Sequence, residues 1–104
     1  MWYDELFEKL EKEQDKQQAT KMSAYMKDNF PFLGVPKPKV NEIIKPYIKS
    51  AAKADKIEWQ FVYLCWEKEY REAQYVGAEY IYAVQKKLVF HDIERIKKLI
   101  TEKS

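Results

Sequence analysis

Hydrophobic residues recur at helical spacing along almost the whole chain, and sustained strand-like alternation is absent. In the first segment, Trp2, Leu6, Phe7 and Leu10 fall on one face of a helix, while Glu and Lys occupy the other faces. The same spacing predicts six helices, near residues 2–16, 19–28, 38–51, 57–68, 69–87 and 92–104. The pattern therefore predicts an all-α fold.

The segment between the second and third predicted helices breaks this pattern. Residues 29–36 contain two prolines and one glycine among apolar side chains. Proline lacks a backbone donor and glycine destabilises a helix interior, so a structured apolar loop is predicted there.

The later helices differ in how they should be buried. Residues 57–68 are apolar almost all round, which predicts a helix in the middle of a stack. In the next helix, the small residues Ala73 and Gly77 leave room for a neighbouring helix to approach closely. The last helix carries an apolar stripe at Ile93, Ile96, Leu99 and Ile100. Because terminal repeats normally need a polar outer face, this stripe predicts a homodimer through the C-terminal helix.

Six helices with short connections predict three antiparallel pairs, each roughly a third of the chain long. Pairs of that size are typical of α-solenoid repeats, which bury their faces only by stacking on neighbours. A plain helical bundle is the structural alternative.

Composition excludes disorder and restricts the cellular setting. The chain is 46% hydrophobic and 15% aromatic, and its net charge of +2 does not by itself indicate a nucleic-acid-binding protein. The lone cysteine, Cys65, lies in an apolar run and cannot form an internal disulfide, which predicts a buried structural thiol in a reducing compartment. The sequence shows neither a signal peptide nor a membrane span, so we expect a cytoplasmic protein without membrane contact.

Candidate catalytic and metal sites are few. His91 is the only histidine, so a zinc site or a Ser-His-Asp arrangement lacks the partners it needs. We therefore expect no metal, no cofactor and no catalytic residue within the chain. Lys37 and Lys39 flank Pro38 at the start of the third helix, where they could position DNA phosphates. Solubility is an equally good explanation for any single lysine.

Two segments carry more specific patterns. Residues 22–35, Met-Ser-Ala-Tyr-Met-Lys-Asp-Asn-Phe-Pro-Phe-Leu-Gly-Val, run from a tyrosine-methionine-lysine helix into a Phe-x-Phe-Leu-Gly loop followed by a proline. Residues 66–75, Trp-Glu-Lys-Glu-Tyr-Arg-Glu-Ala-Gln-Tyr, contain an acidic-aromatic-basic turn that leads into a small-residue helix. Both resemble the DNA alkylation repair family, the AlkD-like glycosylases, and together they extend the resemblance along essentially the whole chain.

The resemblance implies a HEAT-like solenoid, an α-α superhelix whose concave basic face binds double-stranded DNA. Family members remove cationic N3- and N7-alkylated purines, whose positive charge already makes them good leaving groups. The enzyme then has to stabilise an oxocarbenium-like sugar with a carboxylate and aromatic faces. By residue match, Tyr25 is implied to lie beside the lesion. The lysines implied to contact DNA are Lys27, Lys37, Lys39 and Lys103.

The sequence also departs from the family pattern. The Trp-Trp-Asp element that carries the family's catalytic carboxylate is absent from residues 1–104, which end in Leu-Ile-Thr-Glu-Lys-Ser where that element would begin. We therefore expect an N-terminal portion of a HEAT-like DNA alkylation repair domain, with DNA-binding helices but no catalytic aspartate. After the proline loop, Val40 and Asn41 replace the family's charged pair, which weakens the implied DNA contacts. The alternative function is a non-catalytic helical-repeat module that binds DNA or a protein partner.

Overall fold

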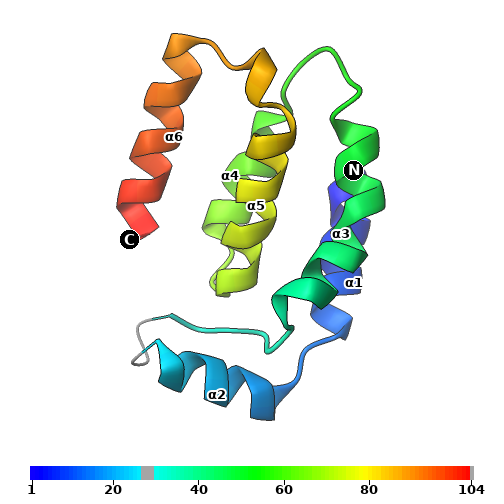
Figure 1. The fold of residues 1–104 in the computed structure, drawn as a ribbon, viewed down its shortest axis with the longest axis vertical. Helices are drawn as coiled ribbons and strands as arrows, with labels where there is room; N and C mark the ends of the chain where they lie inside the picture. The colour runs from blue at the N-terminus through cyan, green and yellow to red at the C-terminus, as the bar shows by residue number, and fades with distance from the viewer. Residues whose placement is uncertain (27–29, 104) are drawn as a thin grey trace.

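The computed structural model describes residues 1–26 and 30–103, whose helices are drawn in Figure 1. Within these residues the chain forms six α-helices and one short 3-10 helix. The α-helices are α1 (Trp2–Lys12), α2 (Lys16–Tyr25), α3 (Lys37–Ala51), α4 (Trp59–Glu67), α5 (Arg71–Ala83) and α6 (Phe90–Lys103), and the 3-10 helix η1 spans Gln85–Lys87. The predicted all-α fold class and the number of helices are confirmed. None of these helices is both long and apolar enough to cross a membrane.

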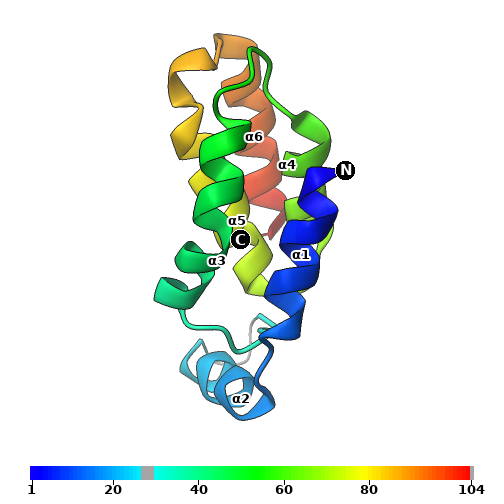
Figure 2. The same ribbon diagram turned by 90° about the vertical axis from the view of Figure 1, so that its right-hand side faces the viewer.

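Most of the helices are arranged in two layers. α3 and α5 lie in one layer and α1 and α4 in the other, as two views at right angles show (Figure 1 and Figure 2). α6 packs against α4, and α2 lies across the end of the layers where α3 begins. The most extensive packing joins α4 to α5, α3 to α5 and α1 to α3.

The packing differs in part from the three predicted antiparallel pairs. α1 packs on α3 and α4 packs on α5, whereas α2 buries no residue and joins none of the main packings within the described residues. The physical reason is the composition of α2. Among its ten residues, only Met22 and Tyr25 are large hydrophobic side chains, which is too little apolar area to drive a helix into the core.

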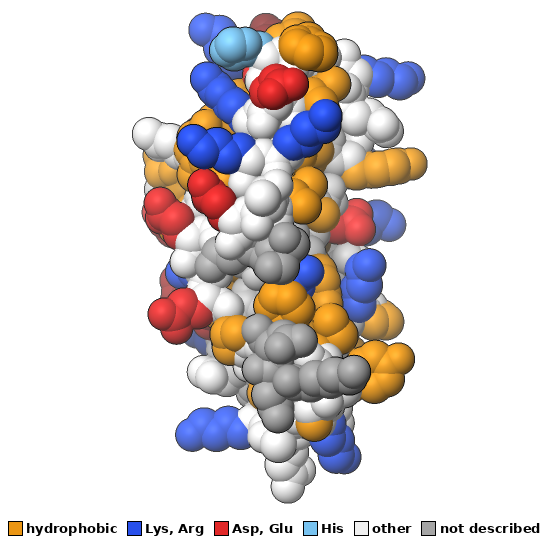
Figure 3. All heavy atoms as spheres, turned by 90° about the vertical axis from the view of Figure 1, so that its left-hand side faces the viewer, with side chains coloured by type: hydrophobic (Ala, Val, Ile, Leu, Met, Phe, Trp, Pro, Cys, Tyr) orange, Lys and Arg blue, Asp and Glu red, His pale blue; other side chains and the backbone are white. Residues whose placement is uncertain are grey.

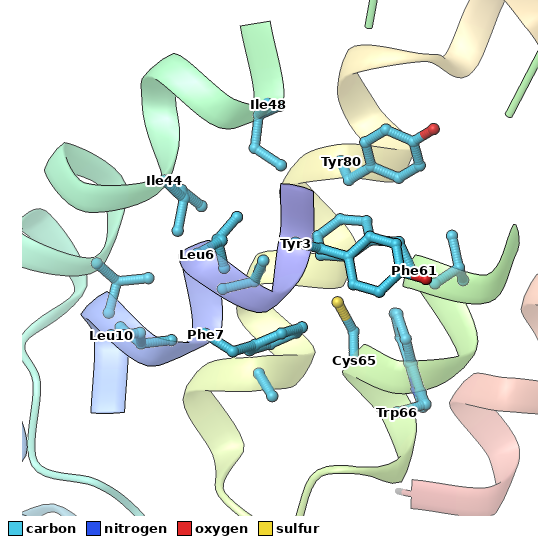
Figure 4. Close-up of a cluster of buried hydrophobic side chains, with 14 of the residues drawn as sticks. Tyr3, Leu6, Phe7, Leu10, Ile44, Ile48, Phe61, Cys65, Trp66 and Tyr80 are labelled. Carbon is cyan, nitrogen blue, oxygen red and sulfur yellow. The ribbon is translucent and has the colours of Figure 1, made fainter. Parts of the chain in front are cut away.

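The core is built around the ring of Phe61 on α4 (Figure 4). Its centroid lies 4.7 to 5.9 Å from the ring centroids of four aromatic residues, Trp2, Tyr3, Phe7 and Tyr80. Phe61, Val62 and Cys65 are fully buried, which confirms α4 as a central helix. Burial raises the pKa of the Cys65 thiol well above its ordinary value, as expected for a structural thiol.

α4 and α5 approach each other closely at Gly77. A Cβ atom on this residue would lie 2.2 Å from Cζ3 of Trp66 and 3.0 Å from Cβ of Cys65. Ala73, one turn earlier on α5, is fully buried. The predicted role of small residues in this helix is therefore confirmed.

Some helices end earlier than the hydrophobic spacing predicts. α1 ends at Lys12 because Asp15 caps a new helix, its Oδ1 accepting hydrogen bonds from the N–H groups of Gln17 and Gln18 at 3.0 and 3.1 Å. α5 ends at Ala83, and the chain then continues as η1. Local capping and turn geometry thus set the helix ends.

Candidate functional site

One buried carboxylate holds the loop between α2 and α3. Glu72, in the first turn of α5, is fully buried. Its two oxygens accept hydrogen bonds from the backbone N–H groups of Leu33, Gly34 and Val35 at 2.9, 3.0 and 3.1 Å. Hydrogen bonds to an ionised acceptor are stronger than neutral ones. The predicted apolar loop is therefore ordered by a polar contact from a distant part of the chain.

Gly34 brings the same loop against the start of α2. Its φ is +92°, and a Cβ atom would lie 2.0 Å from the carbonyl oxygen of Asp15. The N–H of Asp15 donates to the carbonyl oxygen of Leu33 at 2.8 Å. Toward the other end of α2, Oγ of Ser23 donates to the carbonyl oxygen of Phe30 at 3.1 Å. α2 therefore rests on the loop near both of its ends.

On α5, the ring of Tyr75 lies beside two cationic side chains. The guanidinium of Arg71, one turn earlier, is 5.9 Å from the centre of the Tyr75 ring and 4.1 Å from that of Phe30. Nζ of Lys37, at the start of α3, is 5.6 Å from the centre of the same tyrosine ring. Cations are attracted to the negative face of an aromatic ring, so these contacts join α3, α5 and the loop.

A cavity of about 320 Å³ opens between α2 and α5. Its lining residues are Lys21, Met22, Tyr25, Met26, Phe32 and Tyr75. Tyr25 is 87% exposed, so its ring stands at the border of the cavity and outside the core. The described part of the lining is aromatic and apolar and includes the cation of Lys21, which suits a sugar or base edge next to a phosphate. Elsewhere in the described residues, no three His, Cys, Asp or Glu side chains gather as they would need to hold a metal ion.

We call Lys21, Tyr25, Lys37, Arg71 and Tyr75 together the α2–α5 surface. Two residues singled out in the sequence belong to this surface. Tyr25 shares a cavity with Tyr75, and the cationic group of Lys37 lies over the Tyr75 ring. Sequence reasoning missed Lys21, Arg71 and Tyr75. The signal that could have found the last two is their spacing of four residues, which places them on one face of a helix.

The other lysines predicted to contact DNA are placed differently. Nζ of Lys39 lies 3.5 Å from a carboxylate oxygen of Glu13 and 3.8 Å from one of Glu42, so its charge is engaged away from the α2–α5 surface. Lys27 lies outside the described residues, and Lys103 is the last residue of α6. DNA contacts by these three lysines stay predictions.

A larger cavity, of about 570 Å³, lies between α5 and α6. Its lining is mostly apolar and includes Ile81 on α5 with Ile93, Ile96 and Ile100 on α6. Ile93 and Ile100 are 44% and 53% exposed. The face of the molecule that carries α6 shows hydrophobic side chains between basic and acidic ones (Figure 3). The predicted apolar stripe of α6 is thus only partly covered by the described residues.

Comparison with known proteins assigns the chain to a family. The family model described as DNA alkylation repair enzyme matches residues 6–104. The chain belongs to this DNA alkylation repair family. A solved structure described as a predicted DNA alkylation repair enzyme from Enterococcus faecalis matches with a TM-score of 0.82 at 27% sequence identity. No curated protein matches the chain.

The chain spans less than half of that similar structure. The match covers 88% of this chain and 43% of the Enterococcus faecalis protein. Over the matched length, this member of the DNA alkylation repair family shares the helical fold of a longer relative. The resemblance drawn from residues 22–35 and 66–75 is therefore confirmed at the level of the family.

Proposed function

We propose that residues 1–104 bind double-stranded DNA that contains cationic N3- or N7-alkylated purines, through the α2–α5 surface. The observation that carries the proposal is the meeting of Tyr25 and Tyr75 at one cavity, beside the cationic groups of Lys21, Lys37 and Arg71. Membership of the DNA alkylation repair family supports alkylated DNA as the ligand.

The chemistry of the surface suits a nucleotide. Lysine and arginine side chains neutralise phosphates and release counterions, which gives affinity without sequence specificity. Exposed aromatic rings stack on sugars or bases, and their negative faces attract a cationic alkylated purine. Among the described residues, the cavity lining carries the positive charge of Lys21 and no carboxylate. None of these described side chains therefore repels the phosphate backbone.

DNA binding can be tested with a short fluorescent duplex, with or without one 7-methylguanine, titrated at several salt concentrations and followed by anisotropy. We expect Lys37→Ala to reduce the slope of log affinity against log salt by about 0.9, the contribution of one phosphate contact. Tyr25→Ala should weaken binding and leave the slope unchanged, because it removes a ring and no charge.

The matched control is Lys12→Ala. Lys12 is exposed on α1, in the other layer, and pairs with Glu8 at 3.5 Å. This variant loses the same charge and should keep both the affinity and the slope. Equal effects of Lys37→Ala and Lys12→Ala would contradict the α2–α5 surface as the binding site.

We further propose that residues 1–104 bind alkylated DNA without releasing the base. Cleavage of the glycosidic bond calls for a carboxylate that stabilises the developing oxocarbenium-like sugar. The Trp-Trp-Asp element to which the family resemblance assigns that role is absent from these residues. At protein concentrations that saturate the duplex, free 7-methylguanine measured by chromatography should therefore accumulate no faster than in buffer. Faster release would show that another residue supplies the carboxylate.

A helical-repeat module for a protein partner is the second candidate, from a different functional class. The cavity of about 570 Å³ between α5 and α6 favours it, because an apolar groove beside two helices can take one face of a partner helix. Duplex binding that is absent, or independent of both Lys37 and Tyr25, would favour this candidate.

A further inference from the structure

α2 carries two residues of the α2–α5 surface, yet it has little packing of its own. Neither Lys21 nor Tyr25 is buried, nor is any other residue of this helix. α2 takes no part in the main helix packings of the described residues. Its hydrogen bonds through Asp15 and Ser23 both reach the loop formed by residues 30–36. The position of α2 therefore depends on how that loop is held.

The loop in turn is anchored on the first turn of α5. Glu72 accepts three hydrogen bonds from consecutive backbone N–H groups of the loop. The N–H of Arg71 donates to the carbonyl oxygen of Pro31, also in the loop, at 2.8 Å. The partial positive charge at the N-terminal end of α5 also favours the carboxylate of Glu72. One turn of α5 thus supplies a cation of the α2–α5 surface and, at the next residue, the carboxylate that orders the loop.

We propose that Glu72 is a positioning residue of the DNA-binding surface. Through the N–H groups of the loop, its carboxylate sets where α2 holds Lys21 and Tyr25 relative to Tyr75. The part of this inference that concerns DNA rests on the proposed function, whereas the effect on α2 does not. Val35 of the loop and Val84 after α5 also belong to the core, but all its other buried apolar side chains lie on α1, α3, α4 and α5. Weakening the contact therefore frees the loop and α2 before it opens the core.

The variant that tests this role is Glu72→Gln, which keeps the size of the side chain. It replaces one acceptor oxygen by an NH2 donor that faces backbone N–H groups and cannot accept from them. The matched control is Gln74→Met on the same helix. Gln74 is buried, and its Nε2 donates to the carbonyl oxygens of Cys65 and Lys68 at 2.9 and 3.0 Å. This control weakens the α4–α5 junction without touching the loop.

Amide hydrogen exchange gives the first readout and needs no DNA. In Glu72→Gln, we expect exchange to accelerate about tenfold at residues 16–25 and 33–35, since local opening depends on the bonds that hold a segment. Exchange in the other helices should change by less than about twofold. In Gln74→Met, residues 16–25 should keep their wild-type exchange.

A double-mutant cycle on DNA affinity gives the second readout. Tyr25→Ala should weaken duplex binding in the wild-type and Gln74→Met backgrounds. In the Glu72→Gln background, Tyr25→Ala should lower the duplex affinity by less than about twofold, because α2 no longer holds the ring in place. The effects of substitutions at coupled residues are not additive. A general loss of stability would instead leave the two effects additive.

The outcomes separate the inference from the proposed function. Uniform acceleration of exchange in all helices, unchanged exchange at residues 16–25, or additive effects on affinity would each overturn the positioning role. If Glu72→Gln does not fold, Ser23→Ala removes another contact between α2 and the loop, the hydrogen bond to the carbonyl oxygen of Phe30, and should accelerate exchange in α2 to a smaller extent. If the wild-type chain binds no duplex, the proposed function fails, and hydrogen exchange alone decides whether Glu72 positions α2.

Discussion

At the scale of single residues, two positions on α5 decide how closely other segments approach this helix. Glu72 reaches the loop at residues 33–35, and Gly77 leaves space for the ring of Trp66. The close helix approach at Gly77 could be predicted from the sequence, since small residues on a helix let a neighbouring helix pack closely. The burial of Glu72 could not, because it stands among charged residues that read as a solvated turn.

Gly77→Ala should destabilise the protein by about 1–3 kcal/mol, because its Cβ would overlap the buried ring of Trp66 and force the packing to shift. This sign is opposite to helix propensity, which favours alanine over glycine by about 1 kcal/mol. Urea denaturation followed by fluorescence measures the change, read from the midpoint at constant slope. Ala78→Gly at the next, exposed position is the control and should cost only about 1 kcal/mol. A Gly77→Ala variant as stable as wild type would show that the helices can separate without cost.

At the scale of elements, polar contacts connect α1 to the junction of α4 and α5. Oε2 of Glu11 accepts hydrogen bonds from Oη of Tyr70 at 2.5 Å and from Nζ of Lys68 at 3.1 Å. Burial alone would raise the pKa of Glu11, but these two bonds outweigh it and hold the pKa below its usual value. Burial, and then the bond to Glu11, raise the pKa of Tyr70 far above its ordinary value.

Glu11→Gln should therefore destabilise the protein in a pH-dependent manner. A carboxyl group whose pKa is lower in the folded state stabilises the fold above its unfolded pKa, about 4.3, and loses that contribution as pH falls through the folded pKa. We expect a deficit of roughly 1 kcal/mol near neutral pH, limited by the partial exposure of Glu11, that shrinks below about pH 4. Urea midpoints between pH 7 and pH 3 measure it. The control, Glu8→Gln, removes only an exposed ion pair with Lys12 and should lower the stability by a few tenths of a kcal/mol. A loss of stability in Glu11→Gln that does not change with pH would contradict the stabilising role of the Glu11 carboxylate.

At the scale of the whole molecule, the described residues extend over 40 × 28 × 20 Å, with α2 across one end and α6 along one side. Four helices share one core, while α2 and α6 are attached by fewer contacts. α2 contributes to the α2–α5 surface, and α6 borders the larger apolar cavity, whose lining also includes Arg71 and Tyr75 of that surface.

Self-association through that cavity is the prediction that belongs to the whole molecule. We expect light scattering after size exclusion to show dimers whose fraction rises with protein concentration, because Ile93 and Ile100 are partly exposed at its border. Ile100→Glu should shift the population to monomer by placing a charge in the apolar contact. His91→Glu places a glutamate on the same helix outside the cavity lining and should leave the dimer intact. A monodisperse monomer at high concentration would refute the prediction.

The sequence by itself determined the fold class and most of the core. The apolar spacing of Leu6, Leu10, Phe61 and Val62 predicts helices with these residues inside, and all four are fully buried. The loop at residues 30–36 was also predictable, because proline and glycine exclude a helix there. These features depend on local backbone preference and on hydrophobic periodicity, both of which can be read within a few turns of chain.

Only the tertiary structure decided which polar residues meet. Glu72 lies 37 to 39 residues from the amides that it binds, and no local pattern encodes that distance. The two lysines that flank Pro38 look equivalent in the sequence, yet Lys37 lies over Tyr75 while Lys39 pairs with Glu13 and Glu42. Hydrophobic burial needs only a matching face, whereas a hydrogen bond or an ion pair needs particular atoms within a few ångströms. The candidate site therefore emerged from the packing of helices, which a linear pattern does not specify.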